Sequence, residues 1–400
     1  MERSWFELRI DGNEGADRLK LVWTEHTPQD EWPALPYHVS RPALNLASET
    51  VREVLRRLPT DFASLSPDEY QSLLQNLANR GAALADNIFN AVDGNSATAD
   101  EVRQLLLKAS GPGHGRAERS ELRIILGDES VYVPWGFVFQ GDPTELPAVK
   151  SRPIEDFDDF WLGSFRLTTR FQGPSRLQPG KQSACSVYAI HEDLFTEARS
   201  ALQSRYPDIE ARLLQLLSEA KWGTNWTECQ KIWRSVREDY DSVLYVFGHS
   251  DGERINLSEA EGECDYVLPA SSFKTVFGKS KTTRSNSICI LNGCCTAVPN
   301  ADRAWPAGFL TATQSYGFLG FIGTETPVRN DLATIYGVEL LWRLCSEGQT
   351  VGEAFDALQE DPELFPLSLV YSCFANRNFR LRAARATPPE PTAAEVMHAA

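Results

Sequence analysis

A histidine and a pair of adjacent cysteines follow two strongly apolar segments of the chain. The run 242–247 leads into Gly-His, which places His249 just beyond it, and the run 287–291 leads into Asn-Gly-Cys-Cys, which places Cys294 and Cys295. A thiolate is a strong nucleophile, and an imidazole can raise its population or donate a proton to a leaving amine. These residue types therefore indicate nucleophilic catalysis through a thiol.

Strands of a parallel sheet would bring these side chains together, because catalytic groups gather beyond the carboxyl ends of such strands. The small residues around Ser250 and Cys294 would also leave backbone N–H groups able to bind an oxyanion. A buried structural role remains an alternative, because cysteine is among the most buried residue types. A metal site is disfavoured, because adjacent cysteines diverge on an extended chain and no second pair of ligands follows.

Composition sets the class of protein. The 400 residues suffice for two domains or one two-lobed domain, and a hydrophobic fraction of 42% suffices for a large core. The formal charge of −16 disfavours nucleic-acid binding, which requires an excess of Lys and Arg. It favours a soluble protein and weakly a basic partner or substrate, although acidic proteins are common.

The sequence also predicts a cytoplasmic location and no membrane association. The first residues contain no apolar segment of the signal-peptide type, and no run approaches the ~20 apolar residues that cross a bilayer. The eight cysteines show no CxxC pair and no regular framework, so mostly reduced thiols are expected.

The first part of the chain reads as strands and helices that end at a turn-rich segment. A proline-rich connection over 28–42 separates two early strands from three helices, the first of them capped by Ser48 and the second by Ser66. Strands are predicted at 5–10, 19–23, 122–126 and 165–171. The Gly- and Pro-rich stretch 173–180 is the best domain boundary.

The second part alternates strands with helices, which predicts an α/β fold with a mainly parallel sheet flanked by helices. The segment 209–214 is ambiguous between strand and helix, and 255–268 predicts a hairpin-like excursion. Residues 383–400 should form a disordered tail. Strands are predicted at 184–190, 243–247, 287–291, 318–322 and 369–374, and helices at 194–202, 226–236, 307–315, 331–345 and 352–358.

The segment His-Ser-Asp-Gly at 249–252, followed by Ile-Leu-Asn-Gly-Cys-Cys-Thr at 290–296, resembles the CHAT family of caspase-like cysteine peptidases, relatives of caspases and separases. The resemblance covers roughly residues 45–382. It implies a catalytically silent caspase-like lobe over 1–175 and a peptidase domain over 176–382. Supporting matches are Val-Pro-Trp at 133–135, the segments 307–310 and 320–324, the helix 331–344, Gly348 and Ala354.

Two positions depart from the family pattern. Ser250 replaces the usual glycine after the histidine, which keeps the backbone N–H but reduces conformational freedom. Gly136 replaces the glutamate after Pro-Trp, which affects only a structural contact of the first lobe. The register Leu-x-x-Cys-x-Thr assigns the nucleophile to Cys294 and leaves Cys295 as a structural neighbour.

The resemblance implies peptide-bond hydrolysis through an acyl-enzyme, with neither a cofactor nor a third catalytic side chain. Cys294 would be the nucleophile and His249 the acid and base, and the amides of Ser250 and Cys294 would hold the oxyanion. Loops at the same sheet edge, including 324–330 and the region around Trp305, would set specificity. Three acids would favour a basic residue before the cut, although each also reads as a surface acid or a helix cap: Asp251, Glu325 and Asp331.

The expected partners are a protein substrate and an upstream activator protein or protease, because such peptidases commonly act in regulated bacterial defence or cell-death systems. A basic loop over 274–286 suggests autoprocessing, with a plain surface loop as the alternative. Two other functions remain open. One is a catalytically silent caspase-like scaffold that binds partners, and the other is a different thiol hydrolase or acyltransferase with the same dyad.

Overall fold

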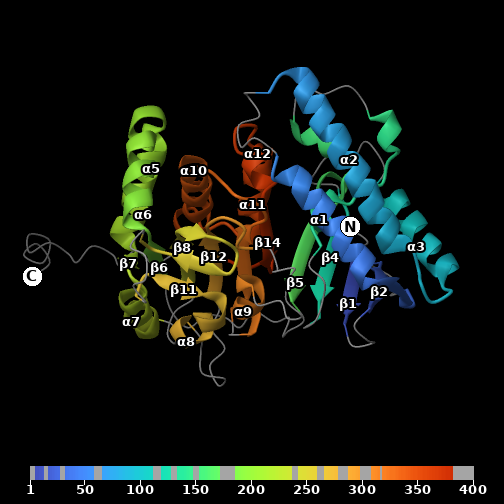
Figure 1. The fold of residues 1–400 in the computed structure, drawn as a ribbon, viewed down its shortest axis with the longest axis horizontal. Coiled ribbons are helices and arrows are strands. Elements are labelled where there is room, and N and C mark those ends of the chain that lie inside the picture. Colours follow the sequence, from blue (N-terminus) through green and yellow to red (C-terminus); the bar gives the residue numbers. More distant parts are fainter. Residues whose placement is uncertain are drawn as a thin grey trace, which may run out of the picture.

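The computed structural model contains two large sheets, one built from the first part of the chain and one from the second, and a small third sheet (Figure 1). Both large sheets combine parallel strand pairs with flanking helices, so the predicted α/β class is confirmed. The structure describes residues 5–12, 17–27, 32–57, 65–110, 119–127, 133–146, 153–171, 185–236, 242–258, 265–277, 287–297, 308–315 and 318–381.

The first sheet has the strand order β3-β2-β1-β4-β5. Phe6, Leu8 and Ile10 alternate with more exposed residues along β1, as the period of a half-buried strand requires. Strand β1 pairs antiparallel with β2 and parallel with β4. The strands are β1 Trp5–Asp11, β2 Arg18–His26, β3 Leu35–Ser40, β4 Glu121–Leu126 and β5 Arg166–Phe171, and the helices are α1 Arg41–Leu55, α2 Pro67–Phe89, α3 Ser96–Ala109 and α4 Trp161–Ser164.

Two details of this part differ from the sequence-based expectations. The stretch 28–42, predicted to be a connection, contains strand β3. A strand can form there despite Pro36 because β3 is an edge strand, in which the missing N–H of proline costs no hydrogen bond of the ladder. Helix α1 begins after Ser40 rather than Ser48, and Ser48 is a buried interior residue whose hydroxyl donates to the Leu44 carbonyl. The cap at Ser66 is confirmed, with a reciprocal bond to Glu69.

The second sheet has the strand order β14-β13-β12-β8-β6-β7. All neighbouring pairs are parallel except β13 and β14, so the mainly parallel sheet is confirmed. The strands are β6 Cys185–Ile190, β7 Lys221–Gly223, β8 Ser242–Phe247, β12 Ser287–Asn292, β13 Gly320–Thr324 and β14 Tyr371–Ala375. Every residue of β8, β12 and β13 is buried, as expected for strands covered on both faces.

Helices cover both faces of this sheet (Figure 1). Tyr245 and Ile290 belong to the core that packs against α5, α6, α10 and α11, whereas Leu244 and Leu291 belong to the core that packs against α7, α8 and α9. The ambiguous segment 209–214 is helical. The helices are α5 Glu192–Arg205, α6 Pro207–Glu219, α7 Trp226–Val236, α8 Phe273–Phe277, α9 Phe309–Ser315, α10 Asn330–Leu341 with a π-helical end Trp342–Ser346, α11 Val351–Glu360 and α12 Phe365–Ser368.

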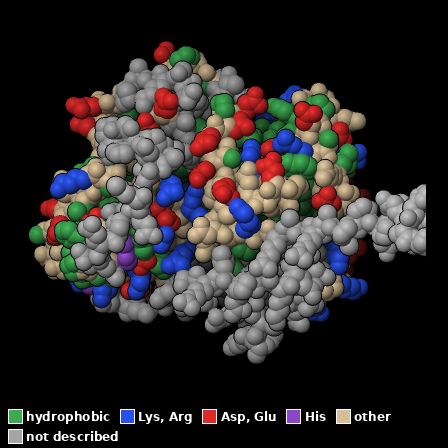
Figure 2. Space-filling view, turned by 180° about the vertical axis from the view of Figure 1, so that it is seen from behind, with side chains coloured by type: hydrophobic (Ala, Val, Ile, Leu, Met, Phe, Trp, Pro, Cys, Tyr) green, Lys and Arg blue, Asp and Glu red, His purple; other side chains and the backbone are tan. Residues whose placement is uncertain are grey.

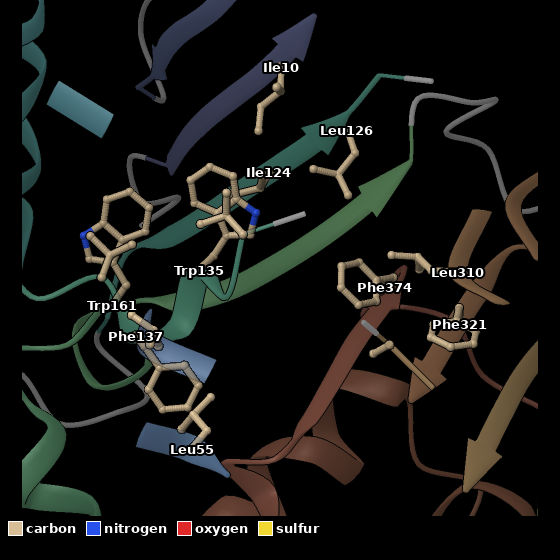
Figure 3. Packing of buried hydrophobic residues seen from close by; sticks show 14 of the residues in the cluster. Ile10, Leu55, Ile124, Leu126, Trp135, Phe137, Trp161, Leu310, Phe321 and Phe374 are labelled. Atoms are coloured by element: carbon tan, nitrogen blue, oxygen red, sulfur yellow. The ribbon is translucent and has the colours of Figure 1, made fainter. Parts of the chain in front are cut away.

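One hydrophobic core runs through both sheets. It contains Trp135 and Trp161 from the first part of the chain and Phe321 and Phe374 from the second (Figure 3). The indole rings of Trp135 and Trp161 are stacked, with centroids 6.1 Å apart. The two parts of the chain therefore share one hydrophobic core.

A small third sheet follows β8 directly. Strand β10 (Arg254–Asn256) pairs antiparallel with β9 (His249–Ser250) on one side and with β11 (Val267–Pro269) on the other. The predicted hairpin-like excursion is thus confirmed. It begins at His249 itself.

Several expectations concern segments outside the described residues: the boundary at 173–180, the region around Trp305, most of the loop 274–286, and the tail 383–400. In the part of the chain that is described, no helix has both the length and the apolar character needed to cross a membrane. On the face seen in Figure 2, described Lys and Arg side chains are interspersed with Asp and Glu.

Candidate active site

Strand register brings His249 and Cys294 to the same edge of the second sheet. Strands β8 and β12 are parallel neighbours, and their last residues, Phe247 and Asn292, are register partners. His249 and Cys294 each follow two residues later. The imidazole and the thiol therefore lie beyond the carboxyl ends of adjacent strands, where parallel sheets place their functional groups.

The loops that carry these two residues are in direct contact. The Gly248 N–H donates to the Asn292 carbonyl at 3.4 Å. A Cβ atom at Gly293 would lie 2.6 Å from the Gly248 carbonyl oxygen, so only glycine fits at this crossing. Gly252, with φ +89°, lies against Cys295, because a Cβ atom there would be 3.2 Å from the Cys295 carbonyl oxygen. The two loops form one site.

The two side chains differ in exposure. His249 is exposed, and Cys294 is partly buried. The Cys294 Sγ donates a weak hydrogen bond to the Val328 carbonyl oxygen at 3.8 Å. Val328 belongs to the segment after β13, so a third strand end contributes to the same edge.

Cys295 has a different environment from its neighbour. Its φ of +55° is in the left-handed region, and it is the one non-glycine residue with positive φ among those the structure describes. Such strained backbone is rare for a side chain with a Cβ atom and gathers at functional sites. Burial raises the pKa of the Cys295 thiol to about 11, and the neighbouring Cys294 adds to this shift. Cys295 is thus a protonated thiol at neutral pH.

Alkylation should report this shift. In a Cys294→Ala variant, Cys295 is expected to react with iodoacetamide at pH 8 about 100-fold more slowly than a cysteine in a short peptide. The rate should rise about tenfold per pH unit between pH 7 and 9, because only the thiolate reacts. Peptide mapping by mass spectrometry gives the rate. A plateau below pH 9 would contradict the raised pKa.

The loop that carries the expected nucleophile Cys294, residues 293–297, is called the nucleophile loop below, and it is held by the residues that end β13. The Thr324 hydroxyl donates to the Gly293 carbonyl, and the Thr324 N–H donates to the Thr296 hydroxyl at 3.0 Å. The Ala297 N–H donates to the Thr324 carbonyl at 2.9 Å, and the Cys295 N–H donates to the Thr326 carbonyl at 3.4 Å. Residues 324–326 therefore fix the loop along its whole length.

A buried hydrogen-bond network anchors the end of β12 just before the loop. The Asn292 amide nitrogen donates to the Tyr245 hydroxyl and to the Ala333 carbonyl, both at 2.8 Å. The Tyr371 hydroxyl donates to the Asn292 amide oxygen at 2.6 Å. A Cβ atom at Gly337 would lie 2.7 Å from the Asn292 amide nitrogen, so glycine in α10 leaves room for the network. Asn292 is 2% exposed and has partners for both ends of its amide.

A second histidine touches His249. His191 follows β6, the other neighbour of β8, and its side chain is completely buried. The rings of His191 and His249 meet edge to face, with centroids 5.3 Å apart and planes at 86°. The His191 Nδ1 accepts the Leu194 N–H at 3.3 Å and so caps α5. An accepting Nδ1 places the proton of neutral His191 on Nε2.

The three acids expected to bind substrate have internal partners. Glu325 is 1% exposed, and its carboxylate accepts from Arg52. The Asp331 carboxylate accepts from the Arg329 guanidinium at 2.7 Å and 3.2 Å. The exposed Asp251 uses one carboxylate oxygen to accept two backbone N–H groups of its own turn. The structure brings Asp251 to the site edge, but it places Glu325 in the interior.

Some site residues carry no obvious signal in the sequence. His191 and Thr324 stand at other strand ends, and only the strand order reveals that they share an edge with His249 and Cys294. Asn292 does carry a signal, although no prediction was drawn from it, because a buried amide at the end of an apolar run needs hydrogen-bond partners. Among the described residues, no group of three or more His, Cys, Asp or Glu side chains is placed to hold a metal ion.

Comparisons with known proteins return structural likeness alone. No family model matches the chain, and no curated protein matches it. Similar solved structures are a chain of the Saccharomyces cerevisiae separase–securin complex at 3.0 Å resolution, with TM-score 0.46 and 11% identity, and one of the same complex at 2.6 Å, with TM-score 0.45 and 10% identity. Each match covers 92% of this chain and 30% of the other.

A third similar structure is described as a protease, with TM-score 0.41, 12% identity, and coverage of 71% of this chain and 70% of the other. The present chain thus spans about 30% of the length of the separase–securin chains it matches. At these identities and TM-scores the likenesses carry no argument about activity.

Proposed function

We propose that this protein is a cysteine endopeptidase in which Cys294 is the nucleophile and His249 the general acid and base. The observation that carries the proposal is the register of β8 and β12, which ends both strands at the edge where the thiol and the imidazole follow. The contact between the two loops and the left-handed backbone at Cys295 support it, because both orient the loop around Cys294.

In the proposed reaction, the Cys294 sulfur attacks the scissile carbonyl carbon and forms a tetrahedral oxyanion. His249 takes the thiol proton and delivers it to the leaving amine, which leaves an acyl-enzyme. A water molecule, deprotonated by His249, then attacks the thioester; the C–S bond breaks, the acid product leaves, and His249 returns the proton to the Cys294 sulfur. The exposed imidazole is accessible to both the leaving group and the water.

Ladder geometry supports an oxyanion role for the Ser250 N–H. The Asp251 N–H donates to the Arg254 carbonyl, which makes these two residues a hydrogen-bonded pair. Hydrogen-bonded and non-hydrogen-bonded pairs alternate along an antiparallel ladder, so the next pair, Ser250 and Ile255, is non-hydrogen-bonded. The Ser250 N–H therefore points away from β10. The Cys294 N–H would supply the second donor.

The substrate is proposed to be a protein, and the resemblance to CHAT peptidases adds a regulated role in bacterial defence or cell death with an upstream activator. Asp251, which is exposed at the site edge, and Asp331, which pairs with Arg329, are both retained in the proposal as contacts for a basic substrate residue. Glu325 is not retained in this role, since Arg52 already neutralises it.

Digestion of a peptide library tests the proposal. The wild-type chain should cleave a defined subset of peptides, and both Cys294→Ala and His249→Ala should abolish that cleavage. A wild-type chain that cleaves nothing, even in the presence of a bacterial lysate as a source of activator, would favour the silent scaffold. Acyl transfer to an added amine in place of hydrolysis would favour an acyltransferase.

His191 is expected to support the reaction by orienting His249. Replacing it with asparagine keeps a side chain suited to cap α5 but removes the ring that contacts His249. We expect His191→Asn to lower kcat about tenfold with little change in KM or melting temperature. His191→Ala should lose the cap as well and also lower the melting temperature. Full activity in His191→Asn would show that the ring contact is dispensable.

A further inference from the structure

A buried ion pair joins the first part of the chain to the segment that supports the nucleophile loop. The Arg52 Nε on α1 donates to the Glu325 Oε2 at 3.1 Å across a sequence separation of 273 residues. Both residues are 1% exposed. The Arg52 Nη1 also donates to Glu49 on the same helix at 2.5 Å, which orients the guanidinium. Two charges withdrawn from water in this way are stable only while they remain paired.

Glu325 is tied to the second sheet by two further bonds. The Ser372 hydroxyl donates to its Oε1 at 2.6 Å, and the Glu325 N–H donates to the Val370 carbonyl at 2.8 Å. The Glu325 carboxylate therefore lies between α1 of the first part and β14 of the second.

The residues on either side of Glu325 hold the nucleophile loop. Thr324 bonds Gly293, Thr296 and Ala297, and Thr326 accepts from the Cys295 N–H. A displacement of Glu325 would move both neighbours, because they are joined to it by rigid peptide units. The loop that carries Cys294 thus depends on a carboxylate whose charge is balanced from another part of the chain.

We propose that Arg52 and Glu325 are positioning residues for the nucleophile loop, through which helix α1 holds Cys294 and Cys295 in the geometry described. The catalytic role of the loop rests on the proposed function, but the link from Arg52 through Glu325 to the loop does not. Without the Arg52 guanidinium, the Glu325 carboxylate turns toward water and residues 324–326 release the loop. The first part of the chain then has a role in the site although it contributes neither the thiol nor the imidazole.

The test measures alkylation of Cys295, which needs no peptidase activity. Cys295 is slow to react while the loop is closed, because burial raises its pKa to about 11. In a Cys294→Ala background, Arg52→Met and Glu325→Gln are each expected to raise its iodoacetamide rate at pH 8 at least about tenfold. The matched control is Arg377→Met. Arg377 also joins the two parts: it donates to the Leu167 carbonyl at 3.3 Å, to the Gly352 carbonyl at 3.2 Å and to Asp356 at 2.5 Å, and none of these partners belongs to the loop or to residues 324–326.

Two milder variants cover the case in which Arg52→Met does not fold. Arg52→Lys keeps the charge, and Ser372→Ala removes one bond to Glu325, so intermediate rate increases are expected from both. In the protein that retains Cys294, Arg52→Lys and Ser372→Ala should each lower kcat more than they change KM. If Arg52 and Ser372 only stabilised the fold, no such selective loss of kcat would be required. Equal Cys295 rates in the Arg52, Glu325 and Arg377 variants would overturn the proposal.

The two proposals fail in different ways. If the wild-type chain cleaves no peptide but the Cys295 rates change as expected, the positioning role stands and the peptidase assignment falls. If cleavage depends on Cys294 but the Cys295 rates stay level, only the positioning role is lost.

Discussion

Cys294→Ala is expected to lower kcat/KM for the best library peptide by about 10⁴-fold or more, because the acyl-enzyme requires the Cys294 sulfur. Cys295→Ala should retain activity to within about tenfold, because the raised pKa leaves Cys295 with little thiolate to act as a nucleophile. Initial rates at several substrate concentrations, corrected for the fraction of folded protein, provide the comparison.

The paired design makes this result decisive about which thiol reacts. The two cysteines are adjacent and both partly buried, so each substitution should disturb the loop to a similar extent. A contaminating protease in the preparation would likewise leave residual cleavage in both variants, so only a difference between them identifies the reacting thiol. Cleavage that persists in Cys294→Ala but disappears in Cys295→Ala would reverse the assignment. Loss in both would indicate that the loop tolerates neither change, and alkylation of the wild-type chain by a peptide fluoromethyl ketone, which releases fluoride and leaves a thioether on the attacking sulfur, would then identify the nucleophile.

Asn292→Ala is expected to destabilise the protein by about 3 kcal/mol, because it leaves several buried polar groups without their partner. Those groups are the hydroxyls of Tyr245 and Tyr371 and the carbonyl of Ala333. Urea unfolding followed by tryptophan fluorescence gives the change in unfolding free energy. Activity should fall as well, since the network ends at the residue before Gly293.

A double-mutant cycle separates lost hydrogen bonds from lost packing. In a Tyr245→Phe/Tyr371→Phe background, two of the three partners are already absent, so Asn292→Ala should cost about 1 kcal/mol. Equal costs in the two backgrounds would show that packing, rather than the network, accounts for the loss.

Much of the second sheet could be predicted from the sequence, because its strands are short apolar runs separated by helix-length segments. The edge location of His249 and Cys294 followed from the same pattern, since both come after such runs. The antiparallel direction of β14 could not be read in this way. A run such as 369–374 carries no mark of its direction, which is set by the helices α11 and α12 that bring the chain back to the edge.

The surroundings of the site depended on contacts between distant residues. Glu325 reads as a surface acid in the sequence, because acids are seldom buried. Its burial depends on Arg52, and no local pattern relates two residues so far apart. His191 likewise became a neighbour of His249 only through the strand order β12-β8-β6. Local patterns predicted the elements, and tertiary pairing decided which side chains meet.

The Arg52–Glu325 pair also bears on how the chain acquires its structure during synthesis. Arg52 leaves the ribosome long before Glu325, and Ser372, which also donates to Glu325, emerges later still. Contacts of such long sequence separation form late in folding, because the entropy of closing the intervening loop opposes them. The Arg52–Glu325 contact can therefore form only after Glu325 has been synthesised, and the Ser372 bond only after Ser372, so a shorter nascent chain lacks this support for its nucleophile loop.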